Sequence, residues 1–214
     1  MKEELISKIE KFSEIYNLFE RQWLGYLDKQ NIKRVNFKRI RVKDLDLRSP
    51  SGVELLDYIS HYRRYIARIN PSSVSILLEV ENIKRTRVKE ALSINQKISK
   101  YIKIEKMAKD KNVAFYVLRC LNDIFGARII IEVIEDFDKM VKELAIRFPD
   151  LRIVNASKNT GYKAIHIYTK PQSGSLPWEL QIWQSCDEGN NTELHTIYKR
   201  DYIEQIKVMQ EVID

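Results

Sequence analysis

The segment from Arg87 to Lys100 carries basic side chains at spacings that suit the binding of a polyphosphate. Arg87 and Lys89 lead in from a β-rich stretch, and Ser93, Lys97 and Lys100 follow them. On a helix, positions i, i+4 and i+7 share one face, which places these last three side chains together. The N-terminus of a helix that begins at or near Ser93 adds a partial positive charge. The segment therefore predicts a cationic wall for phosphate groups.

Two later segments each supply a carboxylate. Asp123 and Arg128 bracket the entry to a β-branched run, and Glu179 begins a run in which Gln181 and Trp183 share its face of a strand. A carboxylate and an amide on a core strand need polar partners. Two such acids fit a Mg²⁺ site completed by substrate phosphates. Taken singly, Asp123 is better explained as an ion-pair partner of Arg128, and Glu179 as an ordinary strand-end acid.

A fourth segment combines a turn, an aromatic ring and positive charge. Gly161 and Tyr162 form a Gly-Tyr turn, and Lys158, Lys163 and His166 surround it. An aromatic face beside basic side chains is typical of loops that stack on a base and bind its phosphates. We therefore expect this loop to bind a nucleotide.

Several other chemistries find no support. The chain contains no GxGxxG, Walker A or HExxH pattern. His61, His166 and His195 are too scattered to indicate a metal site, and Cys120 and Cys186 lack the CxxC spacing of zinc ligands. No apolar run reaches the ~18–20 residues that span a bilayer, and the charged N-terminus does not resemble a signal peptide. We expect a cytoplasmic protein with no membrane partner.

The net charge of +7 on 214 residues is concentrated in two blocks. Seven basic residues and no acid lie between Lys29 and Lys43, and ten basic and three acidic residues lie between Lys84 and Lys111. Two basic blocks on an otherwise acidic chain indicate an anionic partner such as a nucleotide or RNA. The simpler alternative is that these long side chains only solvate a helix face.

Hydrophobic periodicity predicts the elements that must position these residues. Apolar residues spaced by three and four predict a helix over 2–28, and a weakly alternating basic stretch predicts a strand or hairpin over 29–50. The remaining predicted helices cover 53–69, 93–109, 113–124, 136–148 and 192–213, and the remaining strands cover 74–80, 128–134, 151–155, 164–169 and 178–183. This order indicates an α+β fold with a mixed sheet of about five strands flanked by helices. We predict an N-terminal helical appendage over 1–50 and one main domain over 51–214.

These segments, with His195, Tyr198 and Lys199 after them, resemble the synthetase domain of RelA/SpoT-type alarmone enzymes, especially the short single-domain synthetases. The resemblance rests on RVKxxxSIxxK, DIxGxR, KxxGYxxxH, ExQI and HxxYK, which occur in the family's order from Arg87 to Lys199. It implies a nucleotidyltransferase-like synthetase domain that transfers the β,γ-pyrophosphate of ATP to the ribose 3′-hydroxyl of GDP or GTP. The products would be (p)ppGpp and AMP.

The resemblance also implies a role for each matched residue. Arg87 would stack on adenine, while Lys89, Ser93 and Lys97 would contact ATP. Asp123 and Glu179 would bind Mg²⁺, and Glu179 would also activate the 3′-hydroxyl. Tyr162 would stack on the acceptor base. The residues that would line the acceptor side are Lys158, Lys163, His166 and Gln181, and those with a supporting role are Arg128, Gly161, His195, Tyr198 and Lys199.

Three departures from the family pattern bear on the acceptor. The family's Asp-Tyr before the loop is replaced by Arg152-Ile153, and its Pro before the loop lysine by Ser157. The Arg of ExQIRT is replaced by Trp183. A missing cation near the acceptor affects guanine-nucleotide specificity more than use of ATP.

Two alternatives to this function stay open. In a toxin-type relative the acceptor is the 3′ end of tRNA, the basic run 29–43 contacts the RNA backbone, and a neutralising antitoxin is an expected partner. In the other, the domain is a catalytically inactive nucleotide-binding module, against which the presence of both Asp123 and Glu179 argues. The sequence leaves open the acceptor (GDP, GTP, an adenine nucleotide or tRNA) and whether the chain forms a homo-oligomer.

Overall fold

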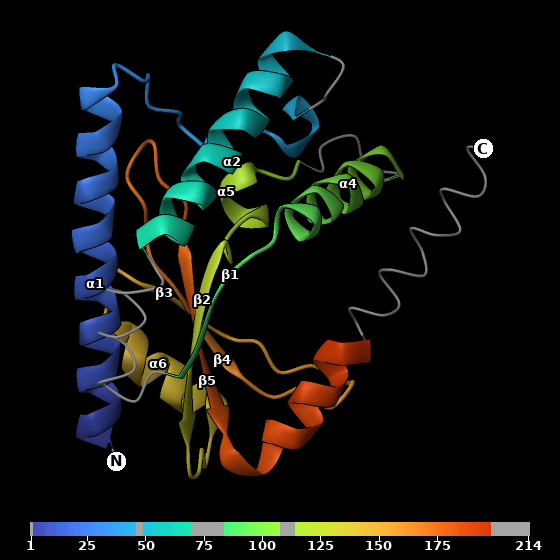
Figure 1. Cartoon of the computed structure of the whole chain (residues 1–214). Helices are drawn as coiled ribbons and strands as arrows, with labels where there is room; N and C mark the ends of the chain where they lie inside the picture. The colour runs from blue at the N-terminus through green and yellow to red at the C-terminus, as the bar shows by residue number, and fades with distance from the viewer. Residues whose placement is uncertain (1, 46–48, 70–83, 108–113, 198–214) are drawn as a thin grey trace.

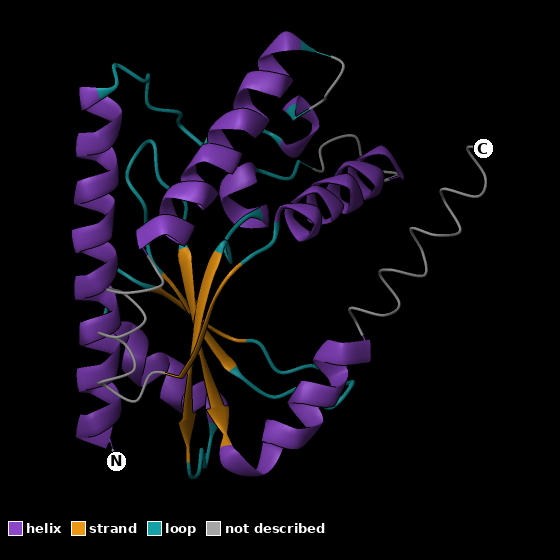
Figure 2. Ribbon diagram, in the orientation of Figure 1, coloured by secondary structure: helices purple, strands orange, loops and turns teal. Residues whose placement is uncertain are grey.

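A mixed five-stranded sheet forms the centre of the molecule (Figures 1 and 2). The computed structural model describes residues 2–45, 49–69, 84–107 and 114–197. The strand order is β1-β2-β5-β4-β3, and only the β2–β5 pair is parallel. The strands are β1 (Lys84–Val88), β2 (Phe125–Ile131), β3 (Arg152–Asn155), β4 (Ile165–Tyr168) and β5 (Trp178–Gln184). The predicted α+β fold with a mixed sheet is therefore confirmed.

Helices flank this sheet on both sides (Figure 1). Helices α1 and α6 lie along one side, whereas α4 and a helix over residues 188–197 lie along the other. The labelled helices are α1 (Lys2–Lys29), α2 (Pro50–Ile69), α4 (Ala91–Met107), α5 (Val117–Cys120) and α6 (Phe137–Arg147). None of the helices in the described part of the chain combines the length and apolar character that a bilayer crossing requires.

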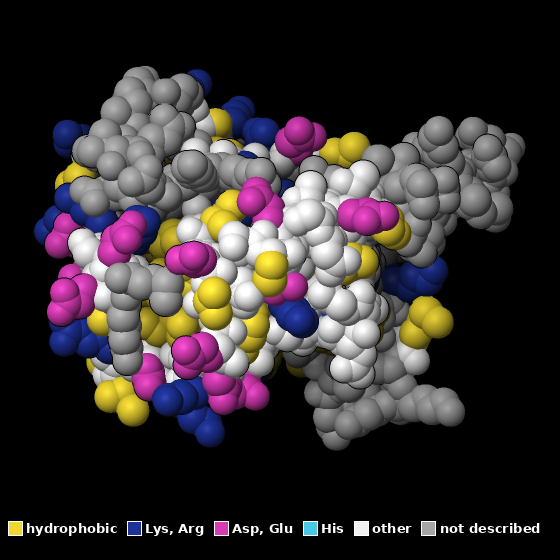
Figure 3. Space-filling model, turned by 90° about the horizontal axis from the view of Figure 1, so that it is seen from below, with side chains coloured by type: hydrophobic (Ala, Val, Ile, Leu, Met, Phe, Trp, Pro, Cys, Tyr) yellow, Lys and Arg dark blue, Asp and Glu magenta, His cyan; other side chains and the backbone are white. Residues whose placement is uncertain are grey.

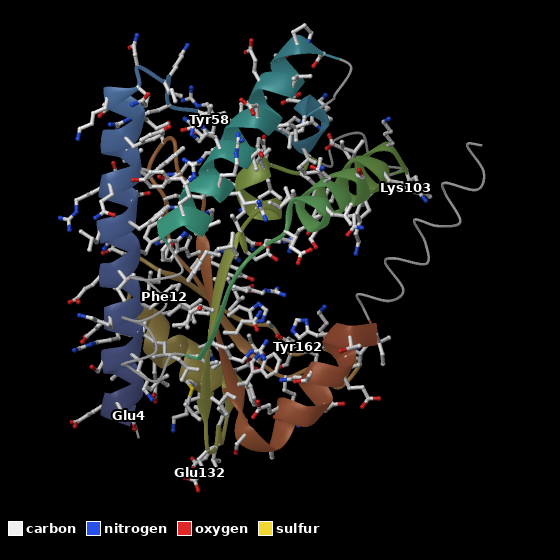
Figure 4. The ribbon with its side chains drawn as sticks, in the orientation of Figure 1. Glu4, Phe12, Tyr58, Lys103, Glu132 and Tyr162 are labelled. Atoms are coloured by element: carbon white, nitrogen blue, oxygen red, sulfur yellow. The ribbon has the colours of Figure 1, made fainter. Side chains whose placement is uncertain are left out.

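The apolar stripe of α1 packs directly on the sheet. The ring of Trp178, at the start of β5, has its centroid 4.8 Å from that of Phe19 and 5.4 Å from that of Tyr16, and 4.1 Å from that of Phe125 on β2. Phe12 also lies between α1 and the sheet (Figure 4). Because these rings share one core cluster with β2 and β5, α1 closes the apolar face of the sheet.

The predicted division of the chain into an appendage over 1–50 and a main domain over 51–214 stays a prediction.

Successive side chains along β5 alternate between the apolar core and the polar face of the sheet. Leu180 and Ile182 are fully buried in the main core cluster with α1 and α6. Glu179 and Gln181, also buried, lie on the opposite face. Because successive strand residues point to opposite faces, the second face is polar. Away from this face, acidic and basic side chains are interspersed on the surface seen from below (Figure 3).

The strand or hairpin predicted over 29–50 is wrong. Between α1 and α2 the described residues form turns and a short 3₁₀ helix, η1 (Val42–Asp44), and an isolated bridge joins Arg41 to Tyr116. The backbone of this stretch bonds instead to the segment before and inside α5: Val42 N–H donates to the carbonyl of Phe115, and the carbonyl of Ile40 accepts from Val117 N–H. The basic run therefore acts as a brace for α5 and does not add a strand to the sheet.

Other predicted boundaries also move. The helix predicted over 113–124 shortens to α5, after which Leu121 adopts a non-helical conformation. α4 begins at Ala91, so Ser93 lies within its first turn and does not cap it. β2 covers Phe125–Ile131, three residues earlier than predicted, and the last described helix begins before residue 192. The strand predicted over 74–80 and the end of the C-terminal helix lie outside the described residues.

Candidate active site

Strand register gathers the polar side chains into two rows across one face of the sheet. In the first row, Arg87 on β1 pairs with Gly126 on β2, which pairs with Glu179 on β5. Gly126 lies between the two charged residues, and a Cβ there would be in ordinary van der Waals contact with Arg87 Nε, at 3.8 Å. In the second row, Arg128 pairs with Gln181, which pairs in turn with His166 on β4. The β2 and β5 residues of each row, more than 50 positions apart in sequence, thus become neighbours.

Glu179 is a buried carboxylate held by two donors. Its Oε2 accepts a hydrogen bond of 2.7 Å from Gln181 Nε2, and its Oε1 lies 3.1 Å from His166 Nδ1. Burial alone would raise the pKa of Glu179, but the interactions with His166 and Gln181 outweigh it and lower the pKa. Gln181 is itself fixed, because its Oε1 accepts from Arg128 Nη2 at 3.2 Å. The carboxylate is therefore ionised and oriented.

Two tyrosines fix the imidazole of His166. Tyr162 Oη lies 2.9 Å from its Nε2, and Tyr168 Oη lies 3.0 Å from its Nδ1. Burial and the nearby Glu179 charge raise the pKa of Tyr168, so its phenol stays protonated. Tyr168 was not predicted as a site residue, although it shares a strand face with His166.

Asp123 forms the second acidic centre, in the loop just before β2. Its Oδ2 lies 2.5 Å from Lys89 Nζ, and its Oδ1 lies 2.9 Å from Lys97 Nζ. Burial would raise the pKa of this carboxyl, but the ammonium groups of Lys97 and Lys89 outweigh it and lower the pKa to about 2. Asp123 thus pairs with both lysines of the predicted ATP site, while Arg128 contacts Gln181 and Trp183.

A cavity of about 350 Å³ opens on this polar face. Six of the residues predicted for the site line it: Lys97, Lys158, Tyr162, His166, Glu179 and His195. Five others that line it were not predicted: Tyr101, Arg119, Asn122, Ala156 and Tyr168. The cavity therefore brings the loop, β5 and the last described helix together with α4 and α5.

The Lys158–Tyr162 turn forms one wall of this cavity. Gly161 has a φ of +95°, in the left-handed region that favours glycine, and its N–H donates to the carbonyl of Lys158. Tyr162 is only 6% exposed and lies between the sheet and the helix over 188–197 (Figure 4). Its ring meets those of Trp183 and His195 at near right angles. The residue is thus firmly packed into the wall.

Some predicted site residues lie apart from the cavity. Lys163 pairs with Asp187 at 3.9 Å, and its backbone is bonded twice to the buried amide of Asn191. Ser93 and Arg87 do not line the cavity; Arg87 lies at the β1 edge of the polar face. Tyr198 and Lys199 lie outside the described residues.

Trp183, at the position of the family's Arg, is the middle of a three-layer stack. The Arg128 guanidinium carbon lies 3.2 Å from the centroid of the indole, and the His195 ring stacks on Trp183 with its centroid 5.6 Å away. Burial lowers the pKa of His195 to about 4, and the positive charges of Arg128 and Arg87 add to this. His195 is therefore neutral at pH 7.

Comparison with known proteins gives a match to one family. The model of the region found in RelA/SpoT proteins matches residues 86–203, which is more than half of the chain. No curated protein sequence gives a significant match.

Three solved structures with low similarity belong to small alarmone synthetases of Bacillus subtilis. Synthetase 1 shares 22% identity at a TM-score of 0.38, covering 73% of this chain and 86% of that one. Synthetase 2 shares 23% identity at a TM-score of 0.37, covering 65% of this chain and 78% of that one. Synthetase 1 bound to AMPCPP shares 20% identity at a TM-score of 0.33, covering 74% of this chain and 85% of that one. The match over residues 86–203 includes all five motifs from RVKxxxSIxxK to HxxYK, and the chain belongs to the RelA/SpoT family.

Proposed function

We propose that the protein transfers the β,γ-pyrophosphate of ATP to the ribose 3′-hydroxyl of GDP or GTP and releases AMP. Membership of the RelA/SpoT family supports pyrophosphate transfer of the (p)ppGpp type. The observation that carries the finer proposal is the presence of two ionised acids at the polar face, the buried Glu179 and the partly buried Asp123. Glu179 lines a cavity of nucleoside size, and Asp123 is bonded to two lysines beside it.

Lys89 and Lys97 are suited to the donor phosphates. Both ammonium groups are partly buried, and among the described residues Asp123 is the acid that pairs with each of them. A triphosphate chain brings several negative charges, so it can share these cations with Asp123 and be aligned by them. Arg87, exposed at the β1 edge of the same face, is available to the adenine end of the donor.

Glu179 is suited to act as the general base. In the proposed step, the acceptor 3′-oxygen forms a bond to the β-phosphorus of ATP as the bond from that phosphorus to the α,β-bridging oxygen breaks. AMP leaves with the bonding electrons, and the hydroxyl proton goes to the Glu179 carboxylate. Because phosphoryl transfer is dominated by alignment and charge stabilisation, the two hydrogen bonds that orient Glu179 support this role.

The two acids also fit Mg²⁺, which typically binds one or two protein carboxylates together with substrate phosphates. Within the described ranges, no group of three or more His, Cys, Asp or Glu side chains could hold a metal, so phosphates would complete the coordination. Asp123 and Glu179 would hold the ion. When bound, Mg²⁺ offsets the negative charge that develops on the transferred group. Both Asp123 oxygens now contact lysine ammonium groups, so ion binding requires these contacts to loosen.

A second acceptor, the 3′ end of tRNA, is favoured by the position of the basic run 29–43. The backbone of this run is bonded to residues 115–118, and α5 carries Arg119 into the cavity wall. Positive charge can therefore extend from the cavity toward an RNA backbone.

An inactive nucleotide-binding module is less consistent with the site, since a binding module has no need of two ionised acids.

Parallel incubations with [γ-³²P]ATP and GDP, GTP, ATP or bulk tRNA test the proposal. We expect label on GDP or GTP with wild-type protein and none with the Glu179→Gln variant. Label on tRNA alone would replace the first acceptor with the second. No label on any acceptor, from protein with a native circular dichroism spectrum, would refute both.

A further inference from the structure

We propose that Arg119 recognises the phosphate carried on the 5′-oxygen of the acceptor nucleoside. Arg119 matches none of the five family motifs, and no role was predicted for it. The inference rests on the proposed function, because it concerns the acceptor of that reaction. Its basis is the position, the charge and the support of this one side chain.

The position of Arg119 is on the wall of the acceptor cavity. The cavity is lined by Glu179, the proposed general base, and by His166 and Tyr162, which are assigned to the acceptor. Arg119 lines the same cavity from α5. Of the cations predicted for the donor, only Lys97 reaches the cavity. A ribose whose 3′-hydroxyl faces Glu179 extends its 5′-oxygen away from that acid, toward the rest of the wall. Arg119 is therefore better placed for the acceptor than for ATP.

The charge of Arg119 lacks a counter-ion within the described ranges of the chain. Lys97, by contrast, is paired with Asp123 at 2.9 Å. The Arg119 side chain is exposed at the wall, and no acid of the described residues forms an ion pair with it. A guanidinium can donate two parallel hydrogen bonds to one phosphate group. An unbalanced guanidinium facing a nucleoside-sized cavity thus fits a phosphate.

Arg119 lies on the short helix α5, whose backbone is hydrogen-bonded to residues of the basic run 29–43. The N–H groups of Val117 and Leu118 donate to the carbonyls of Ile40 and Phe37, and Val42 N–H donates to Phe115. Val117 is fully buried. These contacts fix the backbone of α5 before any ligand binds, so the guanidinium needs only side-chain ordering to reach a phosphate.

The phosphate could come from two sources with the same chemistry. In GDP or GTP it is the first phosphate of the 5′ chain. In RNA it is the phosphodiester that precedes the terminal nucleoside. Both place one anionic group on the 5′-oxygen, so the acceptors GDP and cytidylyl-adenosine, each compared with its phosphate-free nucleoside, separate the sources.

The test compares wild type with Arg119→Met, Arg119→Lys and the control Arg147→Met. Arg147 is an exposed arginine on α6, which lies on the other side of the sheet from α4. Calorimetry without ATP measures the affinity for GDP, guanosine, cytidylyl-adenosine and adenosine, and steady-state assays measure the KM for ATP. Charge-assisted hydrogen bonds are worth ~1.5–3 kcal/mol, or roughly ten- to hundredfold in affinity.

We expect Arg119→Met to weaken binding of the phosphorylated acceptor by that factor and to leave the nucleoside and ATP unchanged. Arg119→Lys should recover part of the loss, and Arg147→Met should match wild type. Equal losses for acceptor and nucleoside, a raised KM for ATP, no change in affinity, or a wild type that binds neither acceptor would each overturn the inference. A wild type that binds GDP with this dependence but transfers no label refutes the proposed function and leaves the inference standing.

Discussion

Replacing Asp123 with Asn should destabilise the fold by an amount that depends on pH. The paired lysines lower the pKa of this carboxyl from its ordinary 3.8 to about 2. One pKa unit corresponds to 1.36 kcal/mol, so the ion pairs stabilise the folded state by roughly 2 kcal/mol. Because the pKa of the folded state is the lower one, this contribution is present above about pH 4. It is lost as the pH falls from about 4 toward 2.

Urea unfolding followed by tryptophan fluorescence measures this effect, since Trp23, Trp178 and Trp183 are fully buried. At pH 7, Asp123→Asn should lose about 2 kcal/mol or more, because it also leaves two partly buried ammonium groups without their acid. The control Asp28→Asn removes an exposed pair with Arg34 and should lose less than about 1 kcal/mol. A difference between wild type and Asp123→Asn that is as large at pH 2.5 as at pH 7 would refute the reasoning.

Three further variants or measurements test the site. Glu179→Gln should abolish transfer of label from [γ-³²P]ATP while the thermal unfolding transition stays close to that of wild type; undiminished turnover would remove Glu179 as the base. Tyr162→Ala should weaken acceptor binding by the ~1–3 kcal/mol of a lost base stack, whereas Tyr162→Phe keeps the ring and should lose less; equal affinities for wild type and the Ala variant would exclude the stack. His195, whose pKa is lowered to about 4, should show no imidazole titration by NMR between pH 8 and pH 5.5, and a midpoint near 6.5 would contradict its burial.

The sequence predicted the core better than the connections. The apolar residues of α1 recur at helical spacing, and the structure packs them on Trp178 as one stripe. The predicted alternation along β5 is also confirmed, because Leu180 and Ile182 lie in the core cluster whereas Glu179 and Gln181 are hydrogen-bonded to each other on the other face. Both patterns follow from the geometry of a single element, so they can be seen without knowledge of the rest of the chain.

The segment over 29–50 failed because its partner is distant in sequence. Weak alternation at Val35 and Phe37 predicts a strand, yet the carbonyls of Phe37 and Ile40 accept hydrogen bonds from α5, about 80 residues away. In the described part of this stretch, the buried core residues are Phe37, Val42 and Leu45. A local pattern cannot reveal a bracing contact of this kind.

The residues of the site also divide into those that a sequence motif marks and those that only the fold brings to the cavity. Asp123, Tyr162 and Glu179 belong to motifs whose spacing could be recognised, and the latter two line one cavity. Tyr168 and Arg119 carry no motif, and they enter the site only because β4 pairs with β5 and because α5 is short. Register and helix length are tertiary outcomes, and they decided which unmarked side chains face the cavity.

Trp183 bears on the acceptor in a way that its residue type alone does not reveal. An indole cannot supply the charge of the family's Arg, but the Arg128 guanidinium lies over its ring at 3.2 Å. A cation above an aromatic face is stabilised by the ring, the more so when both are desolvated, and Arg128 also donates to Gln181. Trp183 therefore holds a neighbouring cation against the amide that orients Glu179. Arg128 already belongs to the DIxGxR motif, so it does not replace the charge lost from β5, but the indole fixes its position one strand closer to the donor lysines.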